Sequence, residues 1–188
     1  IILKDEALAK KLRLLKAFGV NRSHGERKIP GDYDVVDLGY NYRMSEVHAA
    51  IGIEQMKKLP TFLERRKENF QMLEIFLSGV NGFCMLPQPV NETNTSSHYC
   101  MGIILDDQFT RNRATIMNQL KSKGIGTSIY YPHPVPHMTY YREKYGEIPC
   151  PNAESISNSI IALPVGPHLD SSDMQTIADG ILSVFKEL

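Results

Sequence analysis

The sequence predicts an α/β protein in which a mostly helical part, residues 1–60, precedes a small α+β domain, residues 61–188. As far as residue 78, apolar residues recur at the three- and four-residue spacing of amphipathic helices. After Gly79, short apolar runs typical of strands alternate with capped helical segments. Few strands combined with several helices are typical of an α+β domain.

The first part holds two predicted helices joined by a loop. Asp5 can cap a helix that ends at Gly19, because the leucines between them fall on one face. Residues 20–39 show no clear period and contain many turn residues, so we expect a loop. Ser45 can cap a second helix, which should stop near Pro60 because proline lacks the backbone donor. This part offers little core of its own and is expected to pack on another part of the protein or on a partner.

The second part opens with a third helix, from Thr61 to Ser78, whose apolar stripe begins at Phe62. Strands are expected at residues 83–86, 98–105 and 127–131. Further helices are expected to be capped by Thr110, to span residues 152–163, and to be capped by Asp170 or Ser171. The intervening residues 132–151 are rich in proline, tyrosine and histidine, and we expect them to be irregular.

The charge pattern argues against nucleic acid as a partner, and the lengths of the apolar runs argue against a membrane span. Lysine plus arginine and aspartate plus glutamate both number 21, whereas nucleic-acid binders usually show a basic excess. The densest basic run, Arg65-Arg66-Lys67, is flanked by Glu64 and Glu68, which indicates a solvated helix face. No apolar run approaches transmembrane length.

The cysteines and histidines do not form a metal site or a disulfide framework in this interpretation. The three cysteines are odd in number and form no CxxC pair, which favours a reducing, cytoplasmic location. His133 and His137 have the spacing of a helical metal pair. Pro134 and Pro136 exclude a regular helix there, so no metal site is expected.

The most distinctive segment runs from Leu38 to Glu46, where polar and aromatic residues alternate just before a helix start. A helix N-terminus suits an anion, Asn41 can donate to a phosphate oxygen, and Arg43 can bind one bidentately. The alternative is a surface loop in which Ser45 is only a cap and Arg43 makes a structural ion pair. From the residues alone that alternative is favoured, because helix starts vastly outnumber phosphate sites.

The same segment, Gly39 to Glu46 with His48 to Gly52, resembles the hallmark of the DegT/DnrJ/EryC1/StrS family. Further blocks similar to the family follow at matching spacing: Asp5 to Ala9 with Gly19, Gly124 to Gly126, Tyr130 to Pro132 with Pro136-His137, Ala153-Glu154 with Leu163-Pro164, and Pro167 to Leu169. These are aminotransferases of fold type I that depend on pyridoxal 5'-phosphate (PLP) and act on nucleotide-linked keto sugars. The resemblance implies a C-terminal fragment of the PLP-transferase fold type I. Residues 1–60 would be the tail of the large PLP-binding domain, and residues 61–188 the small domain.

The resemblance also implies roles for individual residues. Asn41 would reach across a homodimer interface to the PLP phosphate of the partner subunit, with Arg43 beside it as a second cofactor-binding residue. The residues implied to contact substrate are Tyr40, Tyr42, His98, Tyr131 and His137. For each of these residues, a packing role remains an open alternative. His98 has a further alternative, in which it lies at the end of a strand and makes a hydrogen bond to the backbone.

PLP chemistry needs a lysine amine, and the resemblance places this Schiff-base lysine upstream of Ile1. None of the twelve lysines of the chain stands in that context. Lys4 follows the strand-like Ile1-Ile2-Leu3 rather than preceding it. We therefore assign no catalytic residue in this chain and expect the 188 residues to be inactive by themselves.

The complete enzyme is expected to move an amine from an amino acid, with glutamate the expected donor, to a nucleotide-linked keto sugar. It would do so as a homodimer with shared active sites, in polysaccharide biosynthesis. Two alternatives stay open: a PLP-dependent sugar dehydratase, in which histidine replaces the lysine, and a non-catalytic, regulatory relative of the same fold.

Overall fold

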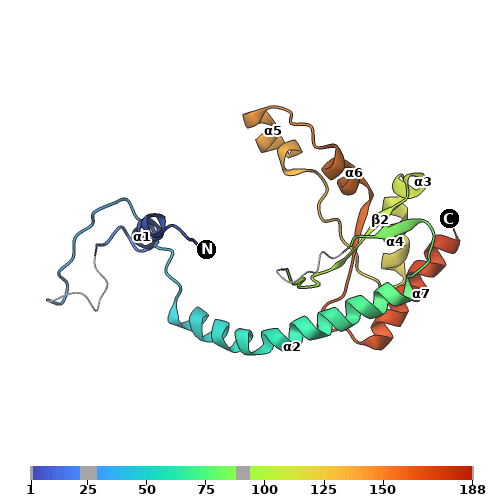
Figure 1. The fold of residues 1–188 in the computed structure, drawn as a ribbon, viewed down its shortest axis with the longest axis horizontal. Helices are drawn as coiled ribbons and strands as arrows, with labels where there is room; N and C mark the ends of the chain where they lie inside the picture. Colours follow the sequence, from blue (N-terminus) through green and yellow to red (C-terminus); the bar gives the residue numbers. More distant parts are fainter. Residues whose placement is uncertain (1, 22–28, 88–93, 188) are drawn as a thin grey trace. The chain divides into compact units, whose positions relative to one another are not determined.

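The computed structural model describes residues 2–21, 29–87 and 94–187. The chain divides into two compact units, Ile1–Lys57 and Lys58–Leu188. Figure 1 labels the α-helices and strand β2. Within the described ranges, no helix is both long and apolar enough to cross a membrane.

The first unit contains helix α1, Glu6–Leu15, and the loop that follows it. The predicted cap is confirmed, because the Asp5 side chain accepts a hydrogen bond of 3.0 Å from the backbone nitrogen of Leu8. After α1 the chain turns at Gly19, whose φ of +67° is readily adopted only by glycine. A Cβ added to Gly19 would lie 1.8 Å from the backbone oxygen of Asp37, and one on Gly39 would lie 1.9 Å from the nitrogen of Gly19. Two loop segments therefore meet backbone to backbone at these glycines.

Helix α2, Glu46–Phe76, is a single helix of 31 residues with Pro60 inside it. The prediction of two helices separated at Pro60 is therefore wrong, although Ser45 does cap the start, its Oγ accepting from the nitrogen of His48 at 3.3 Å. An internal proline costs about 3 kcal/mol. The later turns offset this cost by burying Phe70 and Leu73. Phe62 is exposed, so the buried stripe begins later than predicted.

The second unit is built on a three-stranded antiparallel sheet with the order β1-β2-β3. Its strands are β1, Phe83–Met85; β2, Met101–Leu105; and β3, Ile160–Leu163. Phe83 pairs with Leu105, and Met101 pairs with Leu163. The predicted strand 98–105 starts only at Met101, because His98 has a φ of +45°, which is incompatible with an extended strand.

Two predictions about the third strand are corrected. The helix expected over residues 152–163 ends early: α6 spans Pro151–Ser159, and the run Ile160–Leu163 is β3. Its isoleucines suit the pleated, buried position beside β2. The strand expected at residues 127–131 makes only an isolated bridge between Ser128 and Ala162 of β3.

The remaining helices of this unit are α3, Asp107–Thr110; α4, Arg113–Ser122; α5, Thr139–Tyr145; and α7, Ser171–Lys186. Thr110 is the last residue of α3 and not a cap, because α4 begins after Asn112. Residues 132–151 are less irregular than predicted, since they hold α5 and the 3₁₀ turn Val135–His137. The cap on α7 is confirmed as Asp170, which accepts from the nitrogens of Ser172 and Asp173.

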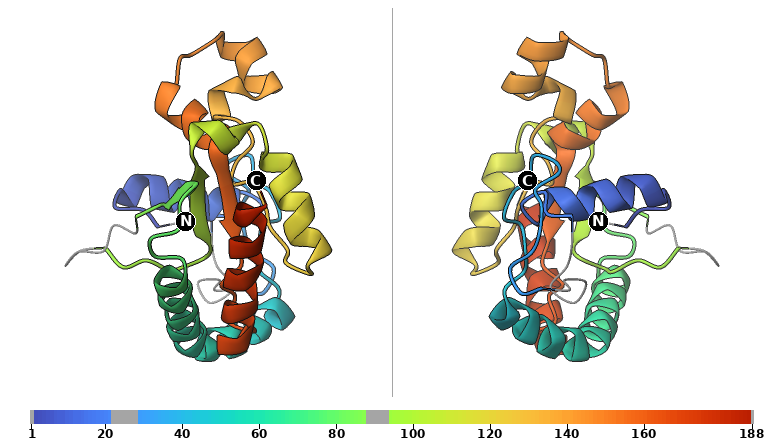
Figure 2. Two further views of the ribbon diagram at one scale, coloured as in Figure 1. Left: turned by 90° about the vertical axis from the view of Figure 1, so that its right-hand side faces the viewer. Right: turned by 90° about the vertical axis from the view of Figure 1, so that its left-hand side faces the viewer.

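The core lies between one face of the sheet and helices α2, α4 and α7. Met101, Ile103 and Leu105 alternate onto that face, as successive strand residues must. Figures 1 and 2 show β2 and β3 side by side within this unit. The helical side of the core consists of Phe70, Leu73, Leu77, Ile116, Leu120, Met174, Ile177, Ala178, Ile181 and Val184.

Candidate functional site

The loop before α2 is fastened to the end of α1 by backbone hydrogen bonds. The nitrogen of Tyr40 donates to the oxygen of Leu15, and the nitrogen of Tyr42 to that of Lys16, at 2.6 and 2.9 Å. In return, the nitrogen of Phe18 donates to the oxygen of Tyr40 at 3.0 Å. These bonds set the path of the loop independently of its side chains, which stay available for other contacts.

The side chains of this loop separate into two pairs. The rings of Tyr40 and Tyr42 stack, with centroids 5.4 Å apart and an interplanar angle of 15°. Residues two apart in an extended segment share a side, which predicts that Asn41 and Arg43 lie on the side away from the tyrosines. The Arg43 guanidinium lies 4.8 Å from the centre of the Phe18 ring.

The polar side-chain groups of Asn41 and Arg43 have no hydrogen-bond partner among the described residues. Both are exposed, and within the residues that the structure describes neither side chain makes a hydrogen bond or an ion pair. The structural ion pair considered for Arg43 is therefore not found there; its contact is the cation–π interaction with Phe18. An amide and a guanidinium that donate from one side of a loop suit the oxygens of a phosphate group.

His98 packs on the edge of the core of the second unit. Its ring is half-buried and lies 5.0 Å from that of Phe70, tilted by 58°. Its backbone nitrogen donates to the Oγ of Ser96 at 3.1 Å. These contacts support the alternative in which His98 has a mainly structural role.

Tyr131 ends a short series of tyrosine rings. Its centroid lies 5.3 Å from that of Tyr130, which lies 6.0 Å from that of Tyr99. Tyr131 is 67% exposed, so most of its ring is free to contact a ligand. The neighbouring hydroxyl of Tyr99 raises the pKa of Tyr130 above its ordinary value, so the Tyr130 phenol is uncharged at neutral pH.

One ring nitrogen of His137 already makes a hydrogen bond. Its Nε2 lies 2.8 Å from the backbone oxygen of Ile148, and because that oxygen can only accept, Nε2 carries the proton. Oε1 of Glu154 lies 3.6 Å from the same nitrogen and also accepts from the nitrogen of Cys150. His137 thus fastens the segment that contains α5, and its Nδ1 is the atom left for a ligand.

The predicted site residues fall into the two units. Tyr40, Asn41, Tyr42 and Arg43 lie together in the first unit, and His98, Tyr131 and His137 lie in the second. The sequence interpretation placed Arg66 on a solvated helix face, whereas the structure has it half-buried over Tyr99. Its spacing of four residues from the buried Phe70 was the signal that could have identified it.

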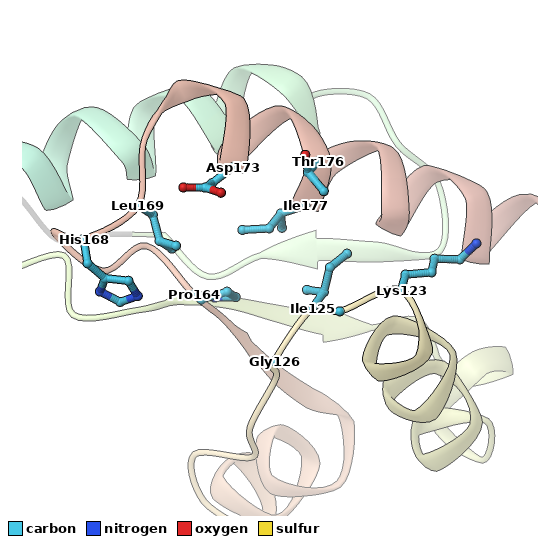
Figure 3. Close-up of a pocket in the computed structure, with 10 residues that line it drawn as sticks. Lys123, Ile125, Gly126, Pro164, His168, Leu169, Asp173, Thr176 and Ile177 are labelled. Atoms are coloured by element: carbon cyan, nitrogen blue, oxygen red, sulfur yellow. The ribbon is translucent and has the colours of Figure 1, made fainter.

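A pocket of about 290 Å³ opens in the second unit beside the start of α7 (Figure 3). The residues that line it are Lys123, Gly124, Ile125, Gly126, Pro164, His168, Leu169, Asp173, Thr176 and Ile177. Two of its charged groups serve the fold: Asp173 accepts from the nitrogen of Asp170, and Lys123 donates to Ser183. None of the predicted site residues lines this pocket.

Comparison with known proteins identifies the family and the fold. Residues 1–182 match the sequence profile of the DegT/DnrJ/EryC1/StrS aminotransferase family. A relative with 27% identity is the UDP-4-amino-4,6-dideoxy-N-acetyl-beta-L-altrosamine transaminase of Campylobacter jejuni subsp. jejuni serotype O:2, with 100% of this chain and 48% of that protein covered.

Solved aminotransferases have the same fold. Helicobacter pylori PseC, involved in the biosynthesis of pseudoaminic acid, matches with a TM-score of 0.86 and 24% identity, over 98% of this chain and 47% of that one. TlmJ from Streptoalloteichus hindustanus matches with a TM-score of 0.83 and 25% identity, over 98% and 47%.

The chain spans about half the length of each of these relatives, and the matching half is the C-terminal one. The predicted fold, the C-terminal part of the PLP-transferase fold type I, is confirmed. Because the profile covers almost every residue, the chain belongs to the DegT/DnrJ/EryC1/StrS aminotransferase family.

Proposed function

We propose that the protein containing this chain is a PLP-dependent aminotransferase that moves an amine from an amino acid, glutamate, to a nucleotide-linked keto sugar. The observation that carries the proposal is the family match over residues 1–182, together with a relative that is a UDP-sugar transaminase. In this proposal residues 1–60 belong to the large PLP-binding domain and residues 61–188 form the small domain.

The loop before α2 fits the phosphate of the cofactor. Asn41 and Arg43 are exposed donors on one side of the loop, and within the described ranges no acidic side chain neutralises the guanidinium. We propose that they hold the PLP phosphate of a partner subunit in a homodimer with shared active sites. When bound, PLP carries the amine between the two substrates and withdraws electrons from the reacting carbon.

The substrate residues of the proposal have the chemistry that a nucleotide sugar needs. The stacked rings of Tyr40 and Tyr42 and the exposed ring of Tyr131 offer flat surfaces to a sugar or a base. Nδ1 of His137 can accept a hydrogen bond from a sugar hydroxyl, since Nε2 is bonded to Ile148. His98 is included as a residue near the substrate.

We place the Schiff-base lysine outside this chain. Every lysine in the described ranges has an exposed side chain, whereas such a lysine works from a desolvated site. We also propose a cytoplasmic location, since Cys84, Cys100 and Cys150 are unpaired thiols. Neither nucleic acid nor a membrane takes part in the proposed reaction.

The proposal is tested on the complete protein with PLP, glutamate and a set of nucleotide-linked keto sugars. Formation of 2-oxoglutarate together with an amino sugar, detected by mass spectrometry, is the expected result. Loss of water from the sugar without use of glutamate would identify a dehydratase. A protein that retains no PLP and turns over neither substrate would indicate the non-catalytic relative.

A further inference from the structure

The basic run Arg65-Arg66-Lys67 is not uniformly a solvated helix face. Nη1 of Arg65 lies 3.3 Å from Oε2 of Glu68, and Nζ of Lys67 lies 3.3 Å from Oε1 of Glu64, both as exposed pairs. Arg66 differs from both neighbours, because it is half-buried and has no acidic partner within the described ranges. Its guanidinium carbon lies 5.5 Å from the centre of the Tyr99 ring.

Helical spacing explains why Arg66 is the exception. It precedes Asn69 by three residues, Phe70 by four and Leu73 by seven, so it lies on the core-facing stripe of α2. These three residues are buried, which holds this face of the helix against the rest of the unit. Arg66 therefore lies at the end of the buried stripe of α2, next to the surface, and the buried residues hold it over Tyr99.

Among the described residues, the guanidinium of Arg66 has no hydrogen-bond acceptor. Its Nε is buried and has no partner in the part of the chain that the structure describes, and its two Nη groups are neither buried nor bonded there. The cation–π contact with Tyr99 leaves the N–H groups of the guanidinium without acceptors among the described residues, and their arrangement matches an oxyanion bidentately. The Nη groups are the part of the guanidinium that a ligand can reach, and an anionic ligand there would supply acceptors for their N–H groups.

Tyrosine rings continue from Arg66 along the surface. Tyr99 stacks with Tyr130 at an interplanar angle of 25°, and Tyr130 contacts Tyr131. Tyr99 is 62% exposed and Tyr131 67% exposed. Exposed aromatic rings bind planar groups by stacking, and a free guanidinium attracts phosphate. A nucleotide carries both of these groups in one molecule.

We propose that Arg66 binds the phosphate oxygens of a nucleotide whose base stacks on the exposed ring of Tyr131, at the end of the tyrosine series. The choice of a nucleotide rests on the proposed function, in which a nucleotide-linked sugar is the acceptor substrate. The carboxylate of the amino-acid donor is also an anion, but it brings no planar ring for the exposed tyrosines.

The test separates the phosphate from the base. The 188-residue chain is titrated calorimetrically with UDP, pyrophosphate, uridine and glutamate. Arg66→Ala is expected to weaken binding of UDP and pyrophosphate about tenfold or more, and to leave uridine unchanged. Tyr131→Ala is expected to weaken UDP and uridine but not pyrophosphate. Arg66→Lys keeps the charge and the helix but loses bidentate binding, so it should retain only part of the affinity for UDP.

Arg65→Ala and Lys67→Ala are the matched controls, because each removes one positive charge from the same turn of α2. Both should bind UDP within about twofold of the unmodified chain. The inference is overturned if the unmodified chain does not bind UDP at about 10 mM, if Arg66→Ala and Arg66→Lys behave like these controls, or if only glutamate binding weakens.

The outcome is independent of the test of the proposed function, since a protein without transaminase activity could still bind UDP through Arg66. In an active complete enzyme, Arg66→Lys should raise KM for the nucleotide sugar while leaving kcat and KM for glutamate unchanged. A fall in kcat with an unchanged KM would contradict the assignment.

Discussion

The fully buried side chain of Asn69 donates a hydrogen bond of 2.9 Å to the backbone oxygen of Gly166, across 97 residues of sequence. The same amide nitrogen also donates to the backbone oxygen of Leu169 at 3.1 Å. One side chain of α2 thus holds the turn between β3 and α7, which carries His168 to the rim of the pocket.

Asn69→Leu keeps the volume of the side chain but removes both bonds. Two carbonyl oxygens would lose this donor, so we expect the unfolding free energy to fall by about 2–4 kcal/mol. Urea denaturation followed by circular dichroism measures the change. Asn118→Ala, at an exposed position of α4, is the control and should change stability by less than about 0.5 kcal/mol. An equally small change for Asn69→Leu would show that the amide does not hold the turn.

Gly39→Ala should disrupt the loop before α2. The added Cβ would lie 1.9 Å from the nitrogen of Gly19 and 2.1 Å from the carbonyl carbon of Phe18, where only backbone could move. We expect faster hydrogen exchange at the nitrogens of Tyr40 and Tyr42. Gly52→Ala is the opposite control. Apart from the adjoining backbone of α2, no atom of the described residues lies within 4 Å of the added Cβ, and alanine in a helix should stabilise by about 0.5–1 kcal/mol. Unchanged exchange in Gly39→Ala would contradict the close approach.

The proposed function predicts that Asn41→Ala weakens PLP binding in the complete protein. Loss of one hydrogen bond to a charged phosphate predicts an increase of about tenfold or more in the dissociation constant. PLP retained after gel filtration, measured by absorbance, gives the result. Asn158→Ala, which removes an exposed amide from α6, should retain PLP normally. Equal retention in both variants would assign the loop a structural role.

The 188-residue chain by itself should show no transaminase activity and no covalent PLP adduct after reduction with borohydride. The reason is that its described lysines are exposed and stand outside the expected sequence context. Peptide mapping of the reduced sample is the measurement. A specific adduct that a single lysine substitution abolishes would disprove this prediction.

The cap of α7 should make stability depend on acid pH. Hydrogen bonds, first from the Ser172 side chain and then from the backbone of Asp173 and Ser172, hold the pKa of Asp170 below its ordinary value. Because the folded pKa is the lower one, the contribution is present above the ordinary carboxyl pKa and is lost as pH falls through the folded pKa. The stability advantage over Asp170→Asn should therefore shrink between pH 5 and about pH 2. A difference that does not change with pH would contradict this.

Local patterns predicted the starts of α1, α2 and α7 and the family. Asp5 and Asp170 were identifiable as caps because a cap bonds to nitrogens two or three residues away, within the same segment. The block from Gly39 to Glu46 identified the family, since it is read from residue order alone. Asn41 and Arg43 followed from that block, and their uncommitted donors fit the proposed role without testing it.

The tertiary structure decided what depends on distant partners. Ile160–Leu163 forms a strand because its backbone can pair with β2. Helix α2 continues through Pro60 because its later turns are buried against the core. Arg66 looks like its charged neighbours in the sequence, yet it lies over Tyr99 because the helix turns it toward the core. A residue's order in the chain determines its local bonds, but whether a side chain meets solvent, a ring or a ligand depends on contacts that only the folded chain brings together.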